Sequence, residues 1–368
     1  MLRFHPLNVR EVRPEAEDAV RLTLEVSPDL EAEFRSRAGQ HIVVRVVVDG
    51  EELRRTYSLV SAPGELPLSI VVRACPSGRL SQHLTRRVRA KDVLEVMPPN
   101  GRFGALPVLP PGGTYVAFAA GCGITPVFSI VSSILTADPA SRVLVFYGNR
   151  SGARAMLLES LLALKDRHVG RVALNFVMSR EPQEIELLNG RIDAGKIAAF
   201  AHRQFVPRAV SAYFVCGPGT MIEEVSRVLE GLGVEPARIR AEHFTAVHGV
   251  AVESRAAGTV QLREDSAEAG PPAEAETRVT VTLDGRRRSF GMRPHDETVL
   301  EAAERSGLDL PFSCRAGVCS TCRAKVVRGE VEMQQNYALT EEELAQGAVL
   351  ACQARALTSE LELTYDAN

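Results

Sequence analysis

The sequence lacks a long apolar run and a strong excess of charge of either sign. No uncharged apolar stretch approaches the roughly 20 residues that a membrane-spanning helix needs. No apolar segment follows the first methionine, so a secretory signal is not visible. The net charge is only −3, which argues against binding to nucleic acid. We therefore expect a cytoplasmic protein whose partners include neither a membrane nor a nucleic acid.

Cysteine is scarce as well, with 7 among 368 residues. Three stand together in "SCRAGVCSTC", as Cys314, Cys319 and Cys322, and Cys352 follows in "LACQAR". In the cytoplasm such groups more often hold metal than form disulfides. A zinc site is one alternative, but zinc favours two C-x2-C pairs and this chain has one. The spacing is typical of a plant-type [2Fe–2S] cluster, which we predict on these four cysteines.

The chain is long for a single hydrophobic core, so we expect a multidomain protein. Residues 1–105 alternate apolar and polar positions, as in "AVRLTLEV", which predicts a small antiparallel β-barrel. Residues 112–245 alternate strand-like and helix-like segments, which predicts an α/β domain with a parallel sheet. Residues 246–276 are rich in Ala, Glu, Gly and Pro and predict a linker. Residues 277–368 predict a compact α+β module, a β-grasp ferredoxin domain, around the cysteines.

Two segments of the predicted barrel have the side chains of a flavin site. "RTYS" offers a cation at Arg55, an aromatic face at Tyr57 and a hydroxyl at Ser58. About twenty residues later, "SGRLS" opens a predicted helix, whose free N–H groups make an anion site for flavin phosphates. Taken together, the two segments predict that the barrel binds FAD.

The segment "AAGCGITP" follows the first strand of the predicted parallel sheet. A turn between a strand and a helix is where the pyrophosphate of a dinucleotide lies, so Gly121 and Gly123 predict a nucleotide loop. Pro126 stands where the usual fingerprint has its third glycine, so the close approach of helix and strand does not follow from the sequence.

The motifs "RTYS", "GRLS", "GCGITP", "VMSRE", "VCGPGTM" and "EHF" occur in an order that resembles the ferredoxin–NADP reductase superfamily, over residues 1–245. With its C-terminal ferredoxin module, the whole chain resembles the reductases that serve bacterial phenylacetyl-CoA epoxidases. "ELLNGRID" and "NYAL" point to this subgroup. The resemblance implies the following cofactor-binding residues: Arg55, Tyr57, Ser58, Gly78, Arg79, Leu80, Ser81, Gly121, Gly123, Thr125, Pro126, Arg150, Ser179, Arg180, Cys216 and Gly217.

The resemblance also implies roles for particular side chains. Ser179 and Arg180 would hold the 2′-phosphate of NADPH, and a planar guanidinium suits a dianionic phosphate. Glu181 stands beside them, and a carboxylate that binds ribose hydroxyls would favour NADH, so both coenzymes stay open with NADPH favoured. The catalytic set implied around the nicotinamide and the flavin is Ser58, Cys216, Glu242 and Phe244.

These features predict an NAD(P)H-dependent FAD/[2Fe–2S] oxidoreductase. Hydride would enter at FAD, and electrons would leave singly through the cluster toward an oxygenase, which the resemblance implies is the di-iron phenylacetyl-CoA epoxidase. A reductase for a Rieske-type or 3-ketosteroid hydroxylase, or for a hybrid-cluster protein, is an alternative. A non-catalytic redox sensor is a further alternative, although a sensor would not need both nucleotide sites.

Overall fold

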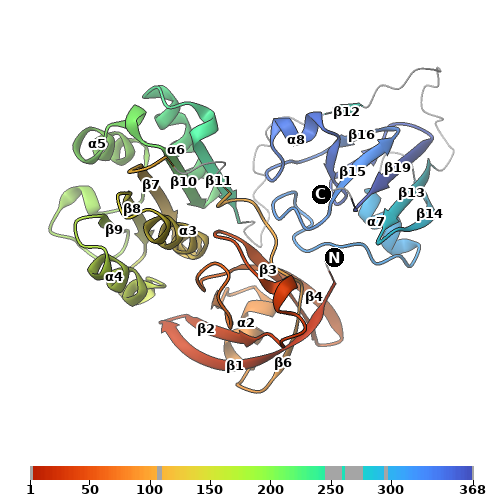
Figure 1. Ribbon diagram of the computed structural model, residues 1–368, viewed down its shortest axis with the longest axis horizontal. Helices are drawn as coiled ribbons and strands as arrows, with labels where there is room; N and C mark the ends of the chain where they lie inside the picture. Colours follow the sequence, from red (N-terminus) through yellow and green to blue (C-terminus); the bar gives the residue numbers. More distant parts are fainter. Residues whose placement is uncertain (1–2, 106–109, 245–258, 262–276, 294–296, 367–368) are drawn as a thin grey trace. The chain divides into compact units, whose positions relative to one another are not determined.

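The computed structural model describes residues 3–105, 110–244, 259–261, 277–293 and 297–366. The chain forms two compact units (Figure 1). One comprises residues 4–249, and the other comprises residues 250–368 together with the first three residues. The described helices include none that is long and apolar enough to cross a membrane.

The first part of the larger unit is a six-stranded antiparallel sheet in the order β4-β3-β6-β1-β2-β5. An isolated bridge between Leu59 and Ile70 joins the end of β4 to β5, which curls the sheet into a barrel. Alternate side chains such as Leu22 and Leu24 fill its core, as the predicted alternation requires. The elements are β1 (His5–Ala16), β2 (Ala19–Glu25), α1 (Glu31–Phe34), β3 (His41–Val48), β4 (Glu51–Ser58), β5 (Leu68–Arg73), α2 (Arg79–Arg86) and β6 (Val93–Val96).

The second part of the larger unit is a five-stranded parallel sheet in the order β11-β10-β7-β8-β9. Separate apolar clusters pack on its two faces, which confirms the predicted α/β architecture. Its strands are β7 (Thr114–Ala120), β8 (Arg142–Asn149), β9 (Val172–Met178), β10 (Ala212–Gly217) and β11 (Ile239–His243). Its helices are α3 (Ile124–Ala137), α4 (Leu158–Arg167), α5 (Ala194–Gln204) and α6 (Gly219–Gly231), with short 3₁₀ turns η1 (Gly121–Gly123), η2 (Gly152–Arg154), η3 (Glu186–Leu188), η4 (Pro207–Ala209) and η5 (Pro236–Arg238).

The smaller unit is an α+β module built on a five-stranded sheet in the order β14-β13-β19-β15-β17. Asp284 and Gly285 both have positive φ, 55° and 69°, so "DG" makes the tight hairpin turn that its sequence predicts. A second sheet has the order β12-β16-β18. The elements are β12 (Thr259–Gln261), β13 (Thr277–Leu283), β14 (Arg286–Met292), α7 (Val299–Arg305), β15 (Arg323–Arg328), β16 (Glu330–Met333), α8 (Glu341–Ala345), β17 (Ala348–Leu350), β18 (Ala354–Ala356) and β19 (Glu360–Thr364).

Most of the predicted linker, residues 246–276, lies outside the described residues. The exception is β12, which pairs antiparallel with β16 of the smaller unit. Part of the predicted linker therefore contributes a strand to the α+β module. The exact domain boundaries stay predictions from the sequence.

Candidate functional site

The four clustered cysteines come from two segments of the α+β unit. Cys314, Cys319 and Cys322 lie on the loop between α7 and β15, and Cys352 lies between β17 and β18. Cys319, Cys322 and Cys352 are buried, and Cys314 is partly exposed. The thiol of Cys314 lies close enough to those of Cys319 and Cys352 to shift its pKa, and the thiol of Cys352 is influenced in the same way by Cys314 and Cys322. The structure thus brings together the four thiols that the sequence predicts as ligands.

The cysteine loop turns its backbone N–H groups toward sulfur. Arg315, Gly317 and Ser320 all have left-handed backbone, with φ of 54°, 71° and 54°. The N–H of Ala316 donates to the sulfur of Cys314 over 3.4 Å. Hydrogen bonds from Cys319 and Cys352 hold the pKa of the Cys314 thiol well below its usual range, against the opposing effect of burial. The loop therefore stabilises anionic sulfur.

Packing fixes the shape of this loop. A Cβ on Gly317 would lie 2.8 Å from the carbonyl oxygen of Gln335, so only glycine fits. The side-chain amide of Gln353 donates to the carbonyl of Arg315 over 3.0 Å and to the sulfur of Cys352 over 3.6 Å. The two cysteine-bearing segments are thereby joined directly.

These residues fit a [2Fe–2S] cluster. Among the described residues, no group of three or more Cys, His, Asp or Glu side chains could hold one metal ion. The four thiols are instead neighbours in the series Cys319, Cys314, Cys352 and Cys322, which supplies the two thiolates that a [2Fe–2S] centre needs at each of its two irons. The hydroxyl of Ser313, next to Cys314, is buried without a hydrogen-bond partner among the described residues. A sulfide-bearing group would give that hydroxyl an acceptor.

The flavin segment ends strand β4. Arg55 is exposed, while Tyr57 is partly buried and burial raises the pKa of its phenol. Ser58 is buried directly opposite His41 across the β3–β4 pair. The segment therefore presents its predicted side chains at one end of the barrel.

The segment Gly78–Ser81 forms the start of helix α2. A Cβ on Gly78 would lie 2.5 Å from the Ser81 hydroxyl, which itself accepts from the N–H of Cys75 over 3.1 Å. Leu80 is buried in the barrel core, so only its backbone is available to a ligand. Arg79 forms an ion pair with Glu51 and donates to the carbonyl of Val48 over 2.8 Å. The helix start keeps its N–H groups for an anion, while the Arg79 side chain binds the β3–β4 hairpin.

The predicted nucleotide loop lies between β7 and α3. A Cβ on Gly123 would lie 2.1 Å from the carbonyl oxygen of Cys216, so this glycine lets the loop touch the end of β10. Thr125 donates to the carbonyl of Cys122 over 2.9 Å. Pro126 is buried in the first turn of α3, where its missing N–H costs no helical hydrogen bond. The close approach that the sequence could not predict is thus present, supplied by Gly123.

The carboxyl end of β10 has Gly217, whose Cβ, if present, would lie 2.6 Å from Met221. Cys216 stands in register with Glu242 on β11. Burial raises the pKa of Glu242 to about 8. Burial and then Glu242 raise the pKa of Cys216. At neutral pH the structure therefore holds a buried thiol beside a neutral carboxyl whose side chain is 13% exposed.

Sequence reasoning missed His41, whose Nδ1 lies 4.0 Å from Oε1 of Glu242. The other carboxylate oxygen of Glu242 is buried with no hydrogen-bond partner among the described residues. His41 therefore connects Ser58 of the barrel with Glu242 of the parallel sheet. Phe244, by contrast, is 37% exposed at the end of the described segment. Its stacking on a flavin stays a prediction.

The residues expected at the 2′-phosphate lie at the carboxyl ends of β8 and β9. Backbone hydrogen bonds of 2.9 Å join Ser179 to Asn149 and Arg180 to Arg150. The side chains of Arg150, Ser179 and Arg180 are exposed. Glu181 accepts the N–H of Gly152 over 2.9 Å. The two arginines and the serine thus form one exposed basic edge, and the carboxylate beside them already has a partner.

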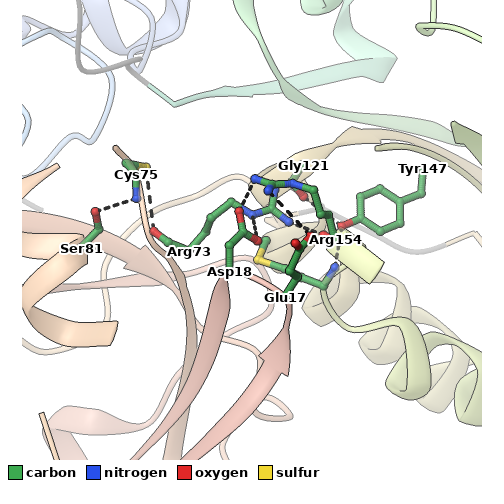
Figure 2. Close-up of polar contacts among 9 residues, drawn as sticks. Glu17, Asp18, Arg73, Cys75, Ser81, Gly121, Tyr147 and Arg154 are labelled. Carbon is green, nitrogen blue, oxygen red and sulfur yellow. Dashed lines mark hydrogen bonds and ion pairs between the residues drawn. The ribbon is translucent and has the colours of Figure 1, made fainter. Parts of the chain in front are cut away.

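A second ionic group that the sequence did not predict joins the barrel to the parallel-sheet domain. Asp18 lies between the guanidinium groups of Arg73 and Arg154 (Figure 2). Nε of Arg73 lies 3.1 Å from Oδ1 of Asp18, and the Arg73 guanidinium also donates to the carbonyl of Arg154. Glu15 accepts the N–H of Leu157 over 2.9 Å. These contacts fix the barrel hairpin β1–β2 on the segment that follows β8.

Three known families match successive parts of the chain. Residues 6–104 match the oxidoreductase FAD-binding domain, and residues 118–227 match the oxidoreductase NAD-binding domain. Residues 281–357 match the 2Fe-2S iron-sulfur cluster binding domain. The chain is therefore an oxidoreductase with FAD, nicotinamide-nucleotide and [2Fe–2S] domains, as predicted.

Two relatives align with nearly the whole chain. The chain is 38% identical to one of the subunits of 1,2-phenylacetyl-CoA epoxidase from Escherichia coli (strain K12), covering 100% of this chain and 99% of that protein. It is 31% identical to the ferredoxin reductase component of 3-ketosteroid-9-alpha-monooxygenase from Rhodococcus rhodochrous, over 98% and 96% of the two chains.

A solved structure, phthalate dioxygenase reductase, described as a modular structure for electron transfer from pyridine nucleotides to [2Fe–2S], has the same fold. The match covers 98% of both chains, with a TM-score of 0.58 and 20% identity. With its flavin, nicotinamide and iron–sulfur domains, the chain belongs to the ferredoxin–NADP reductase superfamily, among the members that carry a C-terminal ferredoxin domain and reduce oxygenases.

Proposed function

We propose that this protein transfers electrons from NADPH, through FAD and a [2Fe–2S] cluster, to the di-iron oxygenase that epoxidises phenylacetyl-CoA. The observation that carries this proposal is the 38% identity, over the whole chain, to a component of a phenylacetyl-CoA epoxidase. The four neighbouring thiols and the glycine-dependent contact between the nucleotide loop and β10 support it. A cytoplasmic location stays a prediction from the sequence.

At the nucleotide end, the role of the protein is to bind and orient. Each NADPH gives up two electrons and one proton in becoming NADP⁺. When bound, FAD would supply the chemistry that takes up these electrons together as hydride and releases them one at a time. Arg55 and the start of α2 would neutralise the flavin pyrophosphate, and Tyr57 would cover the ring. Gly121, Gly123, Thr125, Pro126 and Gly217 would shape the nicotinamide-nucleotide loop.

The proton that accompanies electron transfer would be bound and passed on by Ser58, His41 and Glu242. Burial keeps the Glu242 carboxyl protonated at neutral pH. Because its Nδ1 lies 4.0 Å from Oε1 of Glu242, His41 would receive a proton from that carboxyl through one bridging water or a small movement of either side chain. Cys216 lies next to Glu242 and would fill the space beside the nicotinamide.

At the other end, Cys314, Cys319, Cys322 and Cys352 would be the cluster ligands. The N–H of Ala316 and the amide of Gln353 would stabilise their sulfur as anion. This unit would transfer electrons one at a time to the oxygenase.

For the coenzyme we propose NADPH over NADH. Arg150, Ser179 and Arg180 form the exposed basic edge, and neither guanidinium has an ion-pair partner among the described residues. Glu181, which could bind ribose hydroxyls, is held by the N–H of Gly152. Replacing Arg180 by Ala should raise the KM for NADPH about tenfold or more and leave the KM for NADH within about twofold. Equal effects on both coenzymes would contradict the assignment.

The purified protein should contain FAD and a cluster and should support NADPH-dependent epoxidation by the phenylacetyl-CoA oxygenase subunits. Turnover supported only with a 3-ketosteroid hydroxylase would establish the alternative, which the 31% identity to that system's reductase favours. Reduction of a hybrid-cluster protein alone would favour the third partner. If the loaded protein failed to oxidise NADPH with any acceptor, a redox sensor would be the better interpretation.

A further inference from the structure

Tyr365 lies directly after strand β19 and continues the inward-facing side of that strand. Leu363 and Leu361, two and four residues before it, are buried in the core of the α+β unit. Strand β19 pairs antiparallel with β15, with Lys325 opposite Thr364. Continuing this register places Tyr365 beside Ala324, two residues after Cys322. Its ring packs against the same core that contains Cys322 and Cys352.

The phenolic hydroxyl of Tyr365 is buried and has no hydrogen-bond partner among the described residues. The backbone N–H of Tyr365 is satisfied by the carbonyl of Thr282 at 2.9 Å, so only the side chain lacks a partner. Buried hydroxyl groups in native proteins nearly always have an acceptor. The hydroxyl therefore has room for a partner that the described residues do not supply.

The surroundings of the hydroxyl indicate what that partner is. The core against which the Tyr365 ring packs contains Cys322 and Cys352, two of the predicted cluster ligands. A phenolic hydroxyl can donate a hydrogen bond as well as accept one, and toward a sulfur that carries no hydrogen it is the donor. Sulfur that carries negative charge, as in an iron–sulfur cluster, accepts such bonds.

We propose that the Tyr365 hydroxyl donates a hydrogen bond to a sulfur of the [2Fe–2S] cluster, on the side of Cys322 and Cys352, and raises the cluster's reduction potential. This inference rests on the proposed function, because it needs the cluster to be bound. The reduced cluster has one more negative charge than the oxidised cluster, so it accepts the bond more strongly. Tyr365 is then a tuning residue that makes the cluster a better acceptor for electrons from the flavin.

The test compares the full-length wild type with Tyr365→Phe, which keeps the ring and removes the hydroxyl. Iron content and visible absorbance should be unchanged. The midpoint potential of the cluster, from a redox titration followed by electron paramagnetic resonance, should become more negative. We expect a threefold to tenfold loss in the equilibrium constant for cluster reduction, and tenfold corresponds to about 59 mV for one electron. Ser289→Ala, which removes an exposed hydroxyl from β14 of the same unit, should leave the potential unchanged.

A second substitution keeps the proposal testable if Tyr365→Phe loses its cluster. Site-specific replacement of Tyr365 by 3-fluorotyrosine keeps the shape and makes the phenol a stronger donor, so the potential should become more positive. A merely structural role would not give shifts of opposite sign. Unchanged potentials in both fully loaded variants would overturn the proposal. A wild-type protein that binds no cluster would instead refute the proposed function.

Discussion

At the residue scale, burial decides the charge of Glu242. The carboxyl is removed from water between the barrel and the parallel sheet, and its pKa rises from an ordinary 4.5 to about 8. One of its oxygens has no hydrogen-bond partner among the described residues. A protonated carboxyl next to His41 can donate a proton, whereas an ionised one would be costly in this position.

This burial predicts how stability depends on pH. Between about pH 4.5 and pH 8 the folded protein keeps a proton on Glu242 that the unfolded chain loses, so the free energy of unfolding falls as pH rises. Glu242→Gln should lose this dependence and gain on the order of a few kcal/mol relative to wild type at pH 8. Urea unfolding followed by circular dichroism at a series of pH values measures it. Glu235→Gln, whose side chain is 70% exposed, should follow the wild type, and parallel wild-type and Glu242→Gln curves would contradict the expectation.

The cysteines give a second prediction at this scale. Cys319→Ser should remove the visible absorbance of the cluster while FAD stays bound, because the two sites belong to separate units. NADPH-dependent ferricyanide reduction should persist, and cytochrome c reduction should fall about tenfold or more. Cys75→Ser, at a cysteine outside the cluster, should retain both activities. Loss of flavin in Cys319→Ser, or full cytochrome c activity without the cluster, would refute the assignment.

Residues of the site differ in how far the sequence could predict them. Cys314, Cys319 and Cys322 are close in sequence, and their spacing itself has chemical meaning. His41 and Glu242 come together only because the barrel and the sheet do. Arg154 meets Asp18 across 136 residues of sequence. Such pairs leave no local pattern, so the sequence did not predict them.

At the scale of elements, the alternation of strand-like and helix-like segments predicted the parallel sheet, because parallel strands need a crossover connection that is usually a helix. The central strands β7 and β10 are buried on both faces, as such a sheet requires. The antiparallel barrel followed from the period of two in its strands. The sequence did not predict β12, because a three-residue strand inside a segment rich in Ala, Glu, Gly and Pro shows no detectable alternation of apolar and polar residues.

The contact between η1 and β10 depends on a missing side chain. Gly123→Ala should destabilise the larger unit by about 2 kcal/mol or more, because the new Cβ would lie 2.1 Å from a backbone oxygen. It should also raise the KM for the nicotinamide coenzyme. Gly231→Ala, at the end of α6 with nothing within 4 Å of the new Cβ, should instead be neutral or stabilising by up to about 1 kcal/mol. Thermal unfolding and steady-state kinetics test both, and equal stabilities would contradict this account of the loop.

At the scale of the whole molecule, the barrel and the parallel-sheet domain are joined by charge as well as by apolar contact. Asp18 has 16% of its side chain exposed, and its partners Arg73 and Arg154 have 13% and 28%. Removing the carboxylate would leave two guanidinium groups close together with little water to screen them.

Asp18→Ala should therefore lower the free energy of unfolding by about 2 kcal/mol and slow hydride transfer, because the two domains would no longer be held in one alignment. Glu17→Ala is the matched control, since Glu17 is 63% exposed and 4.0 Å from Arg154. Its effect should stay within about 0.5 kcal/mol. Denaturant unfolding and stopped-flow reduction of the flavin by NADPH measure both effects. If Asp18→Ala matched Glu17→Ala in both measurements, the ionic group would have no aligning role.

The core of the α+β unit is closed by its own residues: its described members all lie between Val279 and Leu363. A module whose described core consists of its own residues is suited to exchange as one piece. Grafting a different ferredoxin module onto residues 4–249 would direct the electrons to another acceptor protein, while the nicotinamide coenzyme stayed the electron donor. Diversification of such reductases could then proceed by recombination, without rebuilding the flavin chemistry.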